Sequence, residues 1–152
     1  RIQQQMINYI NDLVSIEAFG EDPPFCWLTD FRGFLGNTDD PSLQNLSFNE
    51  QIDHLLSIPI INEIYGHQLF RDWRGNVIAS RCLLWFNNLD LDDVSAQVDA
   101  LRQQRFVSAN QPVNNYFAHY HSSEEEDWPF FTFDTMYLVW EFYDVAVSEL
   151  IW

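Results

Sequence analysis

The residues best suited to chemistry lie close together near position 120. His119 and His121 are two residues apart, and a run of four acids, 124–127, follows them. On a strand this spacing places both imidazoles on one face, where carboxylates can complete a metal site. The acids, however, are consecutive in a segment of loop composition, which fixes no ligand geometry. We therefore expect a solvated acidic loop beside two surface histidines, and no cofactor. His119 and His121 remain the weak candidates for a metal site.

Other catalytic arrangements require residues that this sequence does not bring together. Ser80, Asp72 and His54 are scattered, and none has the setting of a nucleophile elbow. The five glycines are not clustered, so no phosphate-cradling loop is indicated. Acid pairs such as 39–40 and 92–93 are typical of turns and helix caps. The sequence therefore predicts a protein that is not an enzyme.

The two cysteines, Cys26 and Cys82, are far apart and belong to no metal-binding motif. They are consistent with one long-range disulfide in an oxidising compartment, and equally with two buried thiols. The triplet Asn45-Leu46-Ser47 is a sequon, which would permit glycosylation of Asn45 if the chain faces the lumen or the cell exterior.

Aromatic side chains are the candidates for binding. The chain has six Trp and thirteen Phe, enough to supply a core, an interface or an apolar ligand path. Trp73 lies in a predicted turn and Trp128 in a charged loop, so either can be exposed on a contact surface. The candidates for the wall of an apolar path are Phe131, Phe133, Tyr137 and Trp140.

The charge of the chain excludes one class of partner. Among 152 residues there are 23 acids and seven basic residues, all of them Arg, and the formal net charge is −16. Nucleic acids and anionic membrane surfaces bind basic faces, so neither is an expected partner. The length and the 47% content of hydrophobic residues are typical of one domain with its own core.

The first part of the chain, residues 1–66, is predicted to be mainly helical. Its apolar residues recur at steps of three and four, the period of one helix face. Ser47 and Glu50 have the form of a capping box, in which the Ser hydroxyl meets the amide of the third helical residue and Glu reaches back. The predicted helices cover 6–18 and 25–35, which prolines 23 and 24 separate, and a third stretch that begins at the capping box and ends at Pro59.

The second part, residues 67–152, is predicted to contain a hairpin, a strand–helix–strand unit and a terminal helix. The strand over 77–86 is apolar on both faces, so we expect it to be central and covered on both sides. Asp90 and Asp92 are the expected N-caps of a helix through Gln104. A strand around 115–120 follows, and the aromatic segment 131–152 begins as a short strand and turns into a helix. This order predicts an α+β fold, a ferredoxin-like (split βαβ) sandwich with additional packed helices.

Three segments carry a resemblance to a known family. Phe25-Cys26-Trp27-Leu28-Thr29-Asp30-Phe31 resembles an aromatic "CW…DF" segment, 77–86 resembles the strand before a porter helix, and 136–143 resembles an aromatic "FYEQY" segment. Together they are similar to the second large extracellular or lumenal loop of the Patched, Dispatched and Niemann–Pick type C family, part of the resistance–nodulation–division (RND) superfamily. Phe142 stands where that family has Gln, and the Cys-rich insertion of the Niemann–Pick branch is absent.

The resemblance implies a ferredoxin-like, porter-type subdomain that caps or gates the extramembrane side of a permease. Residues 1–152 would be one extramembrane domain fragment, extracellular or lumenal, ending in a membrane-entry helix. Its partners would be a sister extramembrane domain and the transmembrane helices of the same chain. It would help to form an apolar path for a sterol or other lipid-like molecule. The alternative is a non-catalytic protein-interaction module that binds another chain on the extracellular side.

Overall fold

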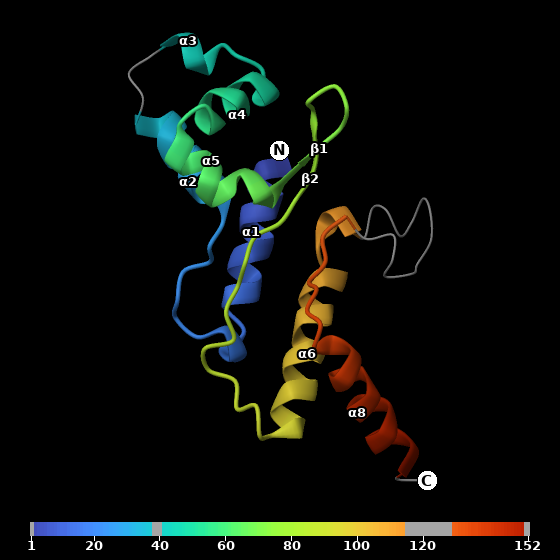
Figure 1. Ribbon diagram of the computed structural model, residues 1–152. Coiled ribbons are helices and arrows are strands. Elements are labelled where there is room, and N and C mark those ends of the chain that lie inside the picture. The colour runs from blue at the N-terminus through green and yellow to red at the C-terminus, as the bar shows by residue number, and fades with distance from the viewer. Residues whose placement is uncertain (1, 38–40, 115–128, 151–152) are drawn as a thin grey trace. The chain divides into compact units, whose positions relative to one another are not determined.

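The computed structural model describes residues 2–37, 41–114 and 129–150 (Figure 1). Their contacts divide the chain into two units: residues 24–84 form one, and residues 1–23 and 85–152 form the other. The described residues are mostly helical, with one small antiparallel sheet of two strands.

The unit 24–84 begins with four helices. These are α2 (Trp27–Asn37), α3 (Pro41–Gln44), α4 (Phe48–Leu56) and α5 (Pro59–Tyr65), followed by the short 3-10 helix η2 (Gly66–Gln68). The predicted capping box is confirmed: the Ser47 side chain accepts a hydrogen bond from the Glu50 amide, and the Glu50 carboxylate accepts one from the Ser47 amide at 2.8 Å. Pro59 occupies the start of α5, so it ends the preceding helix as predicted.

The core of this unit comes from the apolar faces of α2 and α4. Leu28 and Phe31 on α2, and Ile52 and Leu55 on α4, are almost completely buried. The ring of Phe31 meets that of Phe48 edge to face, with 5.8 Å between centroids. On each helix the buried residues are three apart, so one face of each supplies the core.

A buried glutamine connects the core to the start of α2. Gln68 accepts a hydrogen bond from the Trp27 amide at 3.0 Å and donates one to the Phe25 carbonyl at 3.5 Å. A buried carboxamide is costly unless it is paired, and here both its oxygen and its nitrogen have backbone partners.

The sheet of this unit is smaller than the sequence predicts. Strands β1 (Leu69–Arg71) and β2 (Val77–Ser80) pair antiparallel. The expected strand over 77–86, central and covered on both sides, is wrong in both respects: β2 ends at Ser80, and Ile78 is exposed. The physical reason is that the three-residue β1 is the only strand paired with it in the described part of the chain. A strand can extend no further than its partner's free backbone groups allow.

The turn between β1 and β2 follows from its side chains. The carboxylate of Asp72 accepts hydrogen bonds from the amides of Arg74 and Asn76, both at 2.8 Å. Gly75 has φ +85°, which a residue without a Cβ adopts without strain. The turn that the sequence predicts around Trp73 is confirmed.

The other unit is built from α1 (Ile2–Val14), the 3-10 helix η1 (Glu17–Phe19), α6 (Val94–Ala109) and α8 (Tyr137–Leu150). Helix α6 is capped by Asp93, whose carboxylate accepts from the amides of Ser95 and Ala96. The predicted caps, Asp90 and Asp92, are therefore wrong. Asp90 instead accepts a hydrogen bond from the Asp92 amide at 2.9 Å, so these two residues form a turn before the helix.

Aromatic and aliphatic side chains from distant segments form the core of this unit. Tyr9 of α1 stacks on Phe130 with 5.4 Å between centroids, and its hydroxyl lies 2.7 Å from that of Ser108 on α6. The ring of Phe86 stacks on Phe19 at 4.8 Å and meets Trp140 of α8 edge to face at 5.4 Å.

Other predicted elements are either absent from the described residues or lie outside them. Residues 131–136 are described and contain no strand, so the short strand expected before the last helix is wrong. The strand expected around 115–120 lies outside the described residues. Within the residues that are described there is no βαβ unit of ferredoxin type. Nor is any described helix both long and apolar enough to span a bilayer.

Candidate functional site

An apolar hollow of about 270 Å³, the aromatic hollow, lies on the unit formed by 1–23 and 85–152. Leu101 and Arg105 of α6 form one side, the segment Phe131–Asp134 a second, and the first residues of α8 a third. Three of its lining residues, Phe131, Phe133 and Tyr137, are among the candidates for an apolar path.

The side chains at this hollow expose a large part of their apolar surface. The exposed fraction is 60% for Phe131, 78% for Phe133 and 75% for Leu138. Soluble surfaces tolerate single apolar side chains, but neighbouring large ones around a concavity indicate a binding surface.

The polar groups at the hollow are paired with one another. Arg105 of α6 forms an ion pair with Glu141 of α8, and the Tyr137 hydroxyl donates a hydrogen bond to the Gln104 carboxamide oxygen. Burial raises the pKa of the Tyr137 hydroxyl above its ordinary value, so it stays protonated at neutral pH. The hollow therefore combines apolar walls with a fixed polar end, an arrangement suited to binding and positioning.

Helix α8 presents different surfaces on its two faces. Trp140 is 1% exposed and packs against Phe86, with its ring centroid 5.5 Å from that of Tyr137. Trp140 is therefore a core residue here and does not line the hollow. The opposite face carries Leu138, Val139, Phe142 and Val145, all exposed. A helix that is apolar on both faces is ordinarily buried on both, so this face is suited to a partner.

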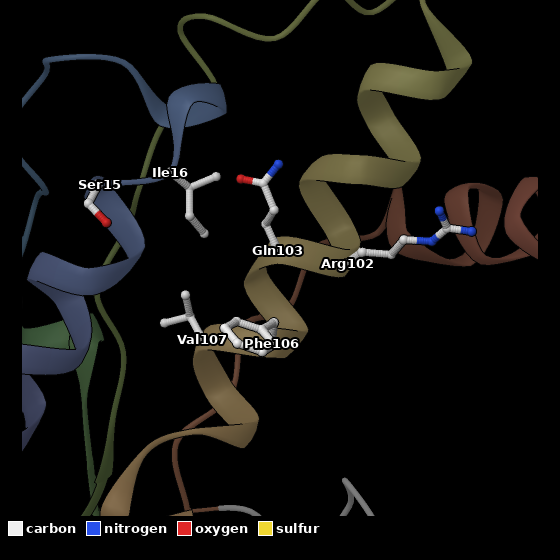
Figure 2. Close-up of a pocket in the computed structure, with 6 residues that line it drawn as sticks. All are labelled: Ser15, Ile16, Arg102, Gln103, Phe106 and Val107. Carbon is white, nitrogen blue, oxygen red and sulfur yellow. The ribbon is translucent and has the colours of Figure 1, made fainter.

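A second, larger hollow of about 480 Å³ lies between the end of α1 and α6. Figure 2 shows Ile16 and Gln103 pointing toward each other across it, with Val107 nearby, whereas Arg102 points away. Arg102 instead lies 3.7 Å from Asp99 on its own helix. Because the polar groups do not converge on this space, it is a weaker candidate for a specific ligand than the aromatic hollow.

Trp73 belongs to the unit 24–84 and lies on the turn between β1 and β2. Its side chain is 86% exposed, and the Arg74 guanidinium lies 4.5 Å from the ring centroid. Trp73 is therefore exposed, as its position in a turn allows. A cation stacked on a tryptophan face holds the ring in place, which suits a contact with another molecule.

Cys26 and Cys82 are joined by a disulfide, so of the two states that the sequence leaves open the bonded one is present. Next to it, Phe25 and Leu83 exchange two backbone hydrogen bonds, at 2.9 and 3.0 Å. Disulfides persist in oxidising compartments, so this bond indicates an extracellular or lumenal location.

The remaining predicted residues divide into two groups. Asn45 is exposed, just after α3. Trp128, His119 and His121 lie outside the described residues. Among the residues that are described, no group of three or more His, Cys, Asp or Glu is placed to hold a metal ion.

Three features of the hollow were missed from the sequence: Leu101, Leu138 and the Arg105–Glu141 ion pair. Leu138 stands next to Tyr137 and belongs to a run of apolar residues in which no single position is distinguished. The ion pair joins residues 36 positions apart. Only the packing of α8 on α6 brings them together, so no local pattern could reveal it.

No protein-family model, curated protein or solved structure matches this chain. The case for its function therefore depends on the hollow lined by Phe131 and Phe133, the exposed Trp73 and the disulfide.

Proposed function

We propose that this chain is an extramembrane domain of an RND permease of the Patched type, and that its aromatic hollow forms part of an apolar path for a sterol or other lipid-like molecule. The observation that carries the proposal is the group of exposed apolar side chains, Phe131, Phe133 and Leu138, around a concave surface. Large apolar area kept in contact with water is a cost that a bound apolar ligand would remove.

The size of the hollow fits a part of such a molecule. At about 270 Å³ it is just below the range of roughly 300–1,000 Å³ that encloses a drug-sized ligand. It would therefore hold one end of a lipid while the remainder stays outside, as in a path through which a molecule passes. The polar groups of Tyr137 and the Arg105–Glu141 pair would meet a hydroxyl or carboxyl group at that end.

Further features support the membrane-protein part of the proposal. The disulfide is in keeping with an extracellular or lumenal side, and the uncovered face of α8 offers a surface for the transmembrane helices or a sister domain. The ferredoxin-like arrangement is part of this proposal. In it, the strand expected at 115–120 would follow α6.

Binding of fluorescent lipids to the purified chain tests the ligand proposal. A fluorescent sterol and a fluorescent fatty acid are titrated into the wild type, Phe133→Ala and Leu138→Ala. Removing either side chain is expected to weaken binding by roughly tenfold or more, because each buries a large apolar area against the ligand. The matched control is Phe142→Ala, since Phe142 lies on the same helix, is 68% exposed and does not line the hollow. Equal binding by all variants, or an equal loss with the control, would exclude the hollow as the site.

A protein-interaction module is the second candidate, and the exposure of Trp73 favours it. Labelled chain is applied to cells and its binding is measured by flow cytometry. If Trp73 is the centre of an interface, Trp73→Ala abolishes binding, because tryptophans are frequent hot spots, while Phe133→Ala leaves it unchanged. The opposite pattern supports the lipid path and removes this candidate.

A further inference from the structure

We propose that Asn45 carries an N-linked glycan that is added before the helix following it has folded. Asn45 is exposed in the short connection between α3 and α4, and the next residue, Leu46, is exposed as well. The sequence has one sequon, Asn45-Leu46-Ser47, and the structure places it on the surface of the unit that contains the disulfide. The oxidising compartment in which disulfides form is also the one in which such glycans are added.

The chemistry requires both ends of the sequon. The donor is an oligosaccharide linked to a lipid pyrophosphate. The Asn45 amide nitrogen forms a bond to the anomeric carbon of the first sugar, the bond from that carbon to the pyrophosphate oxygen breaks, and the amide proton passes to the solvent. The lipid pyrophosphate is the leaving group, so no oxidant or reductant is needed. The transferase recognises the hydroxyl of the third residue, which here is Ser47.

In the folded chain this hydroxyl is already engaged. The Ser47 Oγ donates to the Glu50 carboxylate at 2.7 Å and accepts from the Glu50 amide at 3.4 Å. The Ser47 amide donates to the same carboxylate. These hydrogen bonds lower the pKa of the Glu50 carboxyl, so the group that holds the hydroxyl remains ionised at neutral pH.

The Ser47 hydroxyl can thus bind either the Glu50 carboxylate or the transferase, but not both at once. When α4 has formed, its capping box removes the hydroxyl that the transferase reads; when the transferase holds the sequon, α4 lacks its cap. Glycosylation therefore precedes formation of the capping box.

The first experiment establishes the site. The full chain is given a cleavable signal sequence and translated in the presence of endoplasmic-reticulum microsomes. The wild type is expected to migrate as a species with one glycan that endoglycosidase removes. Asn45→Gln and Ser47→Ala lose this species, whereas Ser47→Thr retains it. Absence of a glycan from the wild type overturns the proposal.

The second experiment tests the order. Purified chain is offered to the isolated transferase with the lipid-linked donor, once folded and oxidised, and once reduced and unfolded. Modification is expected only, or far faster, for the unfolded chain. Glu50→Ala, which removes the carboxylate that binds the Ser47 hydroxyl but keeps the sequon, is expected to raise the rate for the folded chain by about fivefold, in line with the contribution of one hydrogen bond. Equal rates for the folded and unfolded wild type would refute the order of events.

Discussion

The two units of the chain differ in how they bury and expose apolar side chains. One is formed by 24–84 and the other by 1–23 and 85–152. In the first, the inward residues of α2 and α4 are almost completely buried, and a disulfide adds a covalent constraint. In the second, α8 buries Trp140 but leaves Phe142 and Leu138 exposed. Of the two, the second therefore holds more apolar helix surface available for binding.

The exposure on α8 is therefore a property of one face and not of a loosely packed helix. Its inner face is held by an aromatic contact with Phe86, an ion pair with Arg105 and a hydrogen bond with Gln104. A helix anchored in this way can present its outer face with a defined geometry, which a binding surface requires.

The largest expected effect separates the two faces of α8. Trp140→Ala should lower the free energy of unfolding by about 3 to 5 kcal/mol, because it empties a buried indole site. Phe142→Ala should change it by less than about 0.5 kcal/mol, because that ring is 68% exposed. Urea denaturation followed by circular dichroism measures both values. Similar values for the two variants would contradict the distinction between the faces.

The next largest effect concerns the disulfide. Replacing both cysteines, Cys26→Ala with Cys82→Ala, should cost between about 2 and 4 kcal/mol, because the unfolded chain gains the entropy that the cross-link removes. Hydrogen exchange should show the greater loss of protection in α2 and α4, and the smaller loss in α6. Reducing agent should destabilise the wild type but have no effect on the double variant. A uniform loss across both units would show that they unfold together.

A smaller effect is expected at the N-terminus of α4. Ser47→Ala removes the side-chain cap and should destabilise the unit 24–84 by about 1 kcal/mol. Ser47→Thr, which retains a hydroxyl, should cost less. Thermal unfolding of the purified, unglycosylated chains measures the difference. No difference between Ala and Thr at this position would mean that the capping box contributes nothing to stability.

An effect of similar size at neutral pH is expected at Tyr65. Burial, together with the hydrogen bond to Asp30 and its charge, raises the pKa of Tyr65 to about 12. Because the folded pKa lies above the unfolded value, the contribution of Tyr65 is fully present below about pH 10 and is lost as pH rises toward 12. Tyr65→Phe should cost about 1 kcal/mol at neutral pH and reduce the loss of stability over that alkaline range. An identical alkaline profile in both proteins, measured with urea, would contradict this assignment.

Local patterns predicted the parts of the fold that depend on neighbouring residues. The capping box of Ser47 and Glu50, the break at Pro59 and the turn at 72–76 all involve groups within a few positions of one another. Their hydrogen bonds are decided by side-chain chemistry and backbone geometry over one turn, so the sequence alone suffices.

Features that depend on distant partners were predicted less well. The length of β2 is limited by β1, and the burial of Trp140 is decided by Phe86, more than fifty positions away. At the site, Phe131, Phe133 and Tyr137 were predicted because aromatic residues are conspicuous, whereas Leu101 and the Arg105–Glu141 pair were not. The spacing of residues on α8 defines its two faces but cannot decide which one meets α6.

The two ends of the unit 24–84 lie close together, so this unit can be separated from the rest of the chain. Cys26 and Cys82 have their Cα atoms 4.5 Å apart, and Phe25 pairs with Leu83. A segment whose ends meet can be excised from its host and the gap bridged by a few residues, as in the insertion of one domain into another. Residues 1–23 and 85–152 should therefore be expressible as one shortened protein joined by a glycine-rich link. Residues 24–84 should be expressible as a separate small domain whose two ends are held together by the disulfide.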